Sequence, residues 1–159
     1  MNEQELTQIV QSVVRSLDQP KPAVTDVTLD MAKQLIAAVE QRAAQMGVHA
    51  VIAVANKGAN PVAVHCMDDS YIASYDIAFN KAYTCAALKM PTTKLKELAQ
   101  PGGSLYGIQH TNDGRIVIFG GGIPIIKDGV CIGGLGVSGG SEAQDTELAE
   151  SAQTVIDRF

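Results

Sequence analysis

Residues 119–140 read FGGGIPIIKDGVCIGGLGVSGG and hold nine of the fifteen glycines of this 159-residue chain. Within them, two apolar runs at 123–126 and 130–137 are separated by Lys127-Asp128-Gly129. Asp-Gly between β-branched segments favours a tight antiparallel hairpin, because glycine accepts the positive φ that such a turn needs. We therefore expect a β-hairpin here, with the rest of the domain built around it.

Six other glycines of this stretch lie where the expected strands begin or run. Gly120–Gly122 precede the first strand, and Gly133, Gly134 and Gly136 interrupt the second. Glycine weakens a strand, so several together indicate bulges or a place where a ligand or another backbone approaches closely. Two interpretations stay open: a crowded contact between sheet and helix, and a binding site.

The totals indicate one globular domain, because 46% of the residues are hydrophobic and 18% are charged. A net charge of −5 argues against a nucleic-acid partner, and no apolar run is long enough to cross a bilayer. The chain does not start with a signal-peptide pattern, which favours the cytoplasm. Cys66, Cys85 and Cys131 lack metal-type spacing and are expected to be reduced core residues.

Hydrophobic spacing and turn residues predict an α+β domain in which an antiparallel sheet packs against helices. Thr28 and then Thr92 or Thr93 are expected N-caps, and Ser141 with Gln144 forms an expected capping box. The expected helices cover 29–46, 70–88, 92–99 and a segment that begins at Ser141, and the expected strands cover 49–55, 61–67, 115–119 and the two arms of the hairpin.

Three parts are expected along the chain: an amphipathic targeting helix at 1–17, a linker at 18–27 that contains two prolines, and a domain at 28–159. A one-faced helix on such a tether resembles the encapsulation peptides that carry cargo into bacterial microcompartments by docking onto shell or cargo proteins. The other interpretation is a helix that folds back on its own domain or on a sister subunit.

Four motifs follow one another along the chain: Met67-Asp68, Asn80-Lys-Ala-Tyr-Thr84, Pro101-Gly102 followed by Leu105-Tyr-Gly-Ile108, and finally the glycine hairpin. From about Val27 to the C-terminus, this order resembles the GlcG/HbpS family of haem-degrading and haem-binding domains. That family includes the C-terminal domain of a propanediol-utilisation corrinoid protein. The resemblance implies a five-stranded antiparallel sheet between helices, in profilin-like α/β/α layers, assembled as a homo-oligomer. It also favours the targeting interpretation, and with it the lumen of a bacterial microcompartment as the location.

Within such a family, His49, His65 and His110 become competing candidates for the haem iron, since haem iron is commonly held by His, Met, Cys or Tyr. Met67 shares a strand face with His65 and is a further candidate contact. Where family members often carry an arginine before the Met-Asp pair, this chain has Cys66.

Lys81 and the segment 119–124 complete the candidate cofactor site. Lys81 lies on a mostly apolar helix and must reach a partner or the surface. A haem propionate, another anionic ligand, or an acidic residue of a neighbouring subunit would serve. The ring is expected between helix 70–88 and the glycine hairpin, against Phe119, Gly120, Gly121, Gly122, Ile123 and Pro124. Gly139 and Gly140 could cradle an anion, although helix capping is the favoured role.

The sequence therefore favours a non-catalytic or weakly catalytic accessory protein that binds haem, with a flavin or a corrinoid as other flat ligands. An enzyme that degrades haem or assists cobalamin recycling is the alternative, and a purely structural assembly protein is the third. Catalysis by a nucleophile would need a base and an orienting group beside it, and no motif in the chain selects such a set.

Overall fold

The computed structural model describes residues 2–17 and 24–159 and contains a four-stranded antiparallel sheet. The strand order is β2-β1-β4-β3, so two hairpins meet at the central β1–β4 pair. The strands are β1 (Val51–Asn56), β2 (Pro61–Cys66), β3 (Gly122–Lys127) and β4 (Val130–Ser138).

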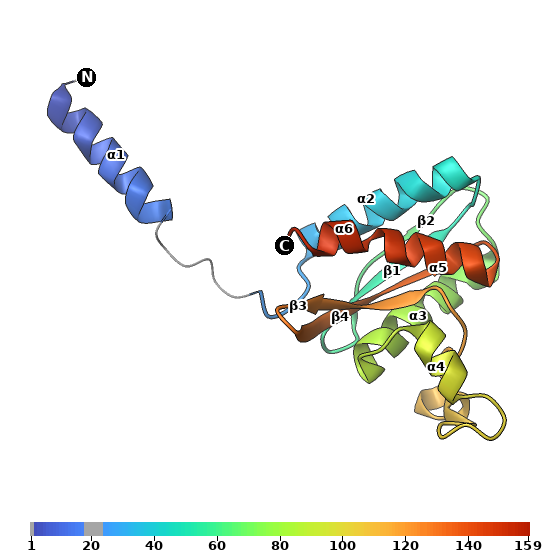
Figure 1. Ribbon diagram of the computed structural model, residues 1–159. Coiled ribbons are helices and arrows are strands. Elements are labelled where there is room, and N and C mark those ends of the chain that lie inside the picture. Colours follow the sequence, from blue (N-terminus) through green and yellow to red (C-terminus); the bar gives the residue numbers. More distant parts are fainter. Residues whose placement is uncertain (1, 18–23) are drawn as a thin grey trace.

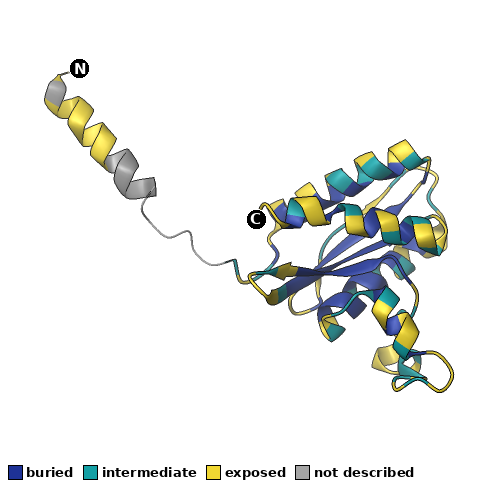
Figure 2. Ribbon diagram, viewed as in Figure 1, coloured by how far each residue is buried: buried dark blue, intermediate teal, exposed yellow. Residues whose placement is uncertain are grey.

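Helices cover both faces of this sheet, as Figures 1 and 2 show, and the sheet between them is largely buried. This layering and the antiparallel pairing confirm the predicted α+β class. One face carries α2 (Leu29–Met46), α5 (Glu142–Ser151) and α6 (Gln153–Ile156). The other face carries α3 (Ile72–Leu88) and α4 (Thr92–Leu98). Two 3₁₀ turns, η1 (Ile108–His110) and η2 (Asn112–Gly114), lie between α4 and β3 in the sequence.

The prediction of five strands was wrong, because residues 115–119 do not form a strand. The backbone N–H of Val117 donates to the hydroxyl of Thr84 on α3, and the N–H of Gly120 donates to the carboxylate of Glu142 on α5. These donors bond to side chains of helices and not to a neighbouring strand. The β-branched residues of the run suggested a strand, but strand propensity measures fit to a half-buried surface more than pairing.

The predicted hairpin is confirmed as β3–β4. Asp128 and Gly129 have φ values of 49° and 77°, as a type I′ turn requires at its two central positions. Lys127 pairs with Val130 across the turn. The Asp-Gly pair therefore sets the register of the two C-terminal strands.

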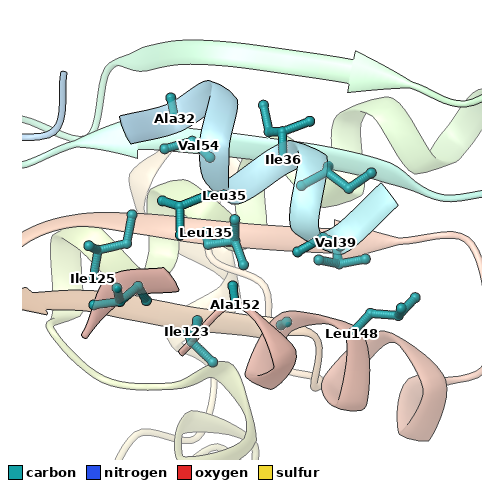
Figure 3. Close-up of a cluster of buried hydrophobic side chains, with 14 of the residues drawn as sticks. Ala32, Leu35, Ile36, Val39, Val54, Ile123, Ile125, Leu135, Leu148 and Ala152 are labelled. Carbon is teal, nitrogen blue, oxygen red and sulfur yellow. The ribbon is translucent and has the colours of Figure 1, made fainter. Parts of the chain in front are cut away.

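The larger core lies between the sheet and the layer formed by α2, α5 and α6. Figure 3 shows the side chains of Leu35 and Val39 on α2 together with Leu135 on β4 and Leu148 on α5. All four are fully buried. Burial of each such side chain stabilises the folded domain by about 1.5–3 kcal/mol.

On the opposite face of β4, Gly134 and Gly136 leave no side chain between the strand and α3. A Cβ atom at Gly134 would overlap the carbonyl oxygen of Ala82, and one at Gly136 would overlap that of Ala78. The two backbones are therefore in direct contact. A flat ring has no room between β4 and α3, so the expected placement of the cofactor there was wrong, and close helix–sheet packing explains these glycines.

Helix ends largely follow the sequence. The hydroxyl of Thr28 accepts from the N–H of Met31 at the start of α2, and Ser141 with Gln144 forms the predicted capping box of α5. The expectation for α4 was wrong, since Pro91 is its N-cap. Thr92 instead accepts a hydrogen bond of 2.9 Å from the N–H of Gly122.

The N-terminal segment forms α1 (Glu3–Leu17), and its side chains Leu6, Ile9 and Val10 are exposed. Residues 18–23 of the expected linker lie outside the described residues. Among the helices that the structure describes, none combines the length and the apolar character that a membrane crossing demands.

The three cysteines differ in their surroundings. Cys85 is buried, Cys131 is partly buried and Cys66 is exposed, so only Cys85 matches the expected core position. Burial raises the pKa of the Cys85 thiol. All three are free thiols, as expected.

The contact between α3 and β4 can be tested with Gly136→Ala. The added methyl group would collide with the Ala78 carbonyl, so we expect the free energy of unfolding in urea to fall by about 1–3 kcal/mol or more. Gly58→Ala is the control: its Cβ would meet only the side chains of Asn60 and Asn56, and we expect a change within about 0.5 kcal/mol. Equal stabilities of the two variants would contradict the packing.

Candidate functional site

A cavity of about 500 Å³ opens beside His49, at the end of the sheet where β4 turns into α5. Three separate segments form it: the connection between α2 and β1, the loop before α3, and the turn from β4 into α5. The residues that line it are Gly47, Val48, His49, Asp69, Tyr71, Gly139, Gly140, Ser141 and Gln144.

The ring of His49 is held in one orientation. Its Nδ1 lies 2.8 Å from the carbonyl oxygen of Asp68. Because a carbonyl oxygen can only accept, Nδ1 carries the hydrogen and the lone pair of the neutral ring lies on Nε2. A histidine bound in this way through one nitrogen is prepared to coordinate a metal with the other.

One exposed aromatic side chain lines this cavity, that of Tyr71, which is 73% exposed. The next residue in the chain, Ile72 at the start of α3, is 98% exposed. Large apolar side chains exposed next to a cavity often mark a binding surface. No lysine or arginine lines the cavity.

The wall formed by Gly139 and Gly140 is closed by capping groups. Both backbone N–H groups donate to Oδ1 of Asp145, at 3.1 and 2.9 Å, and the N–H of Ser141 donates to Gln144. The possible anion cradle is thus filled by side chains of the chain itself, as the capping interpretation predicted.

Lys81 is fully buried on the inner side of α3. Its Nζ donates to Asp145 Oδ2 at 2.8 Å and to the carbonyl oxygen of Val137 at 2.7 Å, and it lies 5.0 Å from the centre of the Phe119 ring. Burial lowers the pKa of the Lys81 ammonium, while the hydrogen bond and charge of Asp145 oppose that shift. The partner of Lys81 is therefore an acidic residue of its own chain.

The expected segment 119–124 gathers around Lys81 and not around His49. A Cβ at Gly121, which has a φ of 107°, would lie 2.5 Å from Lys81 Nζ. The backbones of Gly120 and Gly122 bond to Glu142 and Thr92. Phe119 is partly exposed, whereas Ile123 and Pro124 are buried in β3. None of the residues 119–124 lines the cavity.

The remaining candidates lie elsewhere. His65, on the edge strand β2, places Nδ1 2.9 Å from the Glu40 carboxylate, and Met67 packs against the larger core. His110 is exposed on η1. The structure therefore does not bring the three histidines into one site, and among the described residues no group of three or more His, Cys, Asp and Glu side chains could hold a bare metal ion.

Sequence reasoning missed Tyr71 and Gln144 as cavity residues and the structural role of Asp145. A carboxylate four residues after the N-cap Ser141 was an available signal, because acidic side chains are favoured in the first turn of a helix. The lysine with which it pairs is 64 residues away in the sequence, and no local pattern joins the two.

Residues 27–154 match the family described as "Haem degrading protein HbpS-like". The chain therefore belongs to the HbpS-like family. An uncharacterized 15.0 kDa protein from the dhaT-dhaS intergenic region of Citrobacter freundii is 46% identical over 129 residues, which cover 81% of this chain and 91% of that protein.

Two further relatives carry functional descriptions of their own. The corrinoid adenosyltransferase PduO of Salmonella typhimurium is 38% identical over 123 residues, which cover 77% of this chain but only 37% of PduO. The crystal structure of a PduOC–haem complex matches with a TM-score of 0.79 at 35% identity, over 82% of this chain and 94% of that one.

The buried ion pair leads to a prediction for Lys81→Met. The substitution leaves the Asp145 charge buried without its cation, so we expect the free energy of unfolding to fall by about 3–5 kcal/mol in urea denaturation. Lys96→Met removes the lysine of the exposed pair with Glu142 and should cost about 1 kcal/mol or less. Similar losses for the two variants would show that Asp145 is solvated.

Proposed function

We propose that this member of the HbpS-like family binds haem in the cavity beside His49 and acts as a homo-oligomeric accessory protein. The observation that carries the proposal is the ring of His49, whose Nδ1 is fixed by the Asp68 carbonyl and whose Nε2 remains available. The structural likeness to a PduOC–haem complex at 35% identity supports it.

The residues present fit this cofactor. Histidine is a common axial ligand of haem iron, and a hydrogen bond from the other ring nitrogen to a carbonyl fixes the tautomer that coordination needs. The exposed side chain of Tyr71, which lines the cavity, supplies apolar surface for the ring. Because the cavity has no cationic side chain, the propionates would extend toward solvent.

Each residue has a defined task in this proposal. His49 would hold the iron through Nε2, the Asp68 carbonyl orients the imidazole, and Tyr71 would shield the ring from water. His65, with Met67 beside it, is the competing ligand, since the Glu40 carboxylate fixes its Nδ1 in a similar way. His110 is the third candidate. The bound haem would itself supply the redox chemistry of the iron.

A second candidate function uses the same histidine. The kinship with a corrinoid adenosyltransferase favours a corrinoid, whose cobalt could also accept an imidazole nitrogen. An enzyme that degrades haem is the corresponding catalytic alternative, and loss of the haem absorption bands after addition of a reductant in the presence of dioxygen would support it. A flavin would bind without any role for His49 Nε2, and a purely structural protein would bind none of these molecules.

We propose further that α1 is a targeting helix, which delivers the protein to the lumen of a bacterial microcompartment. The apolar side chains of Leu6 and Val10 are exposed, one helical turn apart. Such a stripe would dock onto a shell or cargo protein. The kinship with PduO supports this setting.

The haem site is tested with His49→Ala. We expect titration of the purified protein with haem to give a sharp absorption band in the wild type, and the variant to bind at least about tenfold more weakly because the iron loses its ligand. His65→Ala and His110→Ala are matched controls and should bind as the wild type does. Loss of binding only in His65→Ala would move the site to β2, and no binding by the wild type would refute the proposal.

The targeting role is tested with Leu6→Glu/Val10→Glu, made in the full chain fused to a fluorescent protein. We expect the fusion to leave the microcompartments and become diffuse, because two charges interrupt the apolar stripe. Gln4→Glu/Gln8→Glu adds the same charges at the same spacing on polar positions and should stay localised. Retention of the first variant would exclude docking through this stripe.

A further inference from the structure

Asp145 connects the buried lysine to the wall of the cavity. Its Oδ2 accepts from Lys81, and its Oδ1 accepts from the backbone N–H groups of Gly139 and Gly140. The residue is 4% exposed and lies in the first turn of α5. One buried side chain therefore fixes two consecutive peptide groups in the wall of the candidate site.

Gly139 transmits this constraint to His49. A Cβ atom at Gly139 would overlap the carbonyl oxygen of His49 and would lie 2.7 Å from Cα of Ala50. The two backbones are thus in contact, with no side chain between them. A displacement of Gly139 would displace the main chain that carries the His49 ring.

Stability alone is a weak reason for this arrangement. Removing an ion pair from water costs free energy that the attraction does not reliably offset, and apolar replacements of similar volume are often as stable. A carboxylate with partners on both oxygens is, however, well suited to fixing geometry, because charge-assisted hydrogen bonds are short and directional.

We propose that Asp145 is a positioning residue for His49, acting through Gly139, and that Lys81 holds the Asp145 carboxylate in place. The inference rests on the proposed function, in that His49 is the residue that holds the iron. Asp145 itself does not touch the bound group. Partners that orient a metal-binding histidine typically change metal affinity by about 10–100-fold when they are removed.

Two matched double variants distinguish the effect of the hydrogen bonds to Gly139 and Gly140 from the effect of the two buried charges. Lys81→Met/Asp145→Asn removes both charges but keeps an oxygen that can accept from Gly139 and Gly140. Lys81→Met/Asp145→Ala removes that oxygen as well. We expect the asparagine variant to bind haem as the wild type does, and the alanine variant to bind about 10–100-fold more weakly with an altered absorption band.

The exposed pair of Arg42 and Glu147 between α2 and α5 supplies the control. Arg42→Met/Glu147→Gln should bind haem as the wild type does, and urea denaturation of each variant without haem reports its folding. Equal haem binding by the two Lys81/Asp145 double variants would overturn the inference. Loss of binding by a folded asparagine variant would also overturn it.

A second measurement needs no haem. We expect the amide hydrogens of Gly139 and Gly140 to exchange slowly in the wild type and in the asparagine variant, and His49 to show one tautomer, protonated at Nδ1, in nitrogen NMR spectra. In the alanine variant, the exchange should be faster and the tautomers mixed. Fast exchange in the wild type overturns the inference without any substitution.

The two proposals fail separately. If the wild type binds no haem but its amide exchange and tautomer are as expected, the proposed function is lost and the positioning of His49 stands. If His49 binds haem and the two double variants agree in affinity, spectrum and amide exchange, the positioning role is lost and the proposed function stands.

Discussion

The direct contact of the α3 and β4 backbones is the constraint on which the rest of the structure depends. Gly134 and Gly136 leave the carbonyl groups of Ala82 and Ala78 against the sheet, so the helix lies closer than ordinary side chains would allow. The buried apolar residues of β4, Ile132, Leu135 and Val137, belong to the larger core. On the α3 side, the sheet offers main chain at Gly134 and Gly136 and only a small cluster of β1 side chains, Val51, Ala53 and Ala55.

This close approach decides where chemistry can occur. It leaves no space for a ligand between β4 and α3. It also places the Lys81 ammonium near the end of β4, where it donates a hydrogen bond to Asp145. A cavity opens beyond that point, beside His49 and the start of α5. The contact between α3 and β4 thus excludes a ligand from between them and, through Lys81 and Asp145, fixes the wall of the candidate site at Gly139 and Gly140.

The sequence predicted what local chemistry determines. The Asp128-Gly129 turn, the caps at Thr28 and Ser141 and the α+β class depend on residues close together in the chain, and the structure confirms them. The run 115–119 was misjudged, because its donors bond to residues distant in the sequence. The candidate residues lie in several separate places, since the contacts that position them also join distant parts of the chain. Nothing local reveals that His49 lies against Gly139.

The strand order has a consequence for how this chain acquires its structure. Each hairpin closes locally, but the central ladder joins Ile52 to Val137, from opposite halves of the domain. Loop closure over so many residues is slow compared with local pairing. The first hairpin therefore has an unpaired, apolar inner edge until β4 is available to pair with it, and during this interval the folding chain is exposed to aggregation.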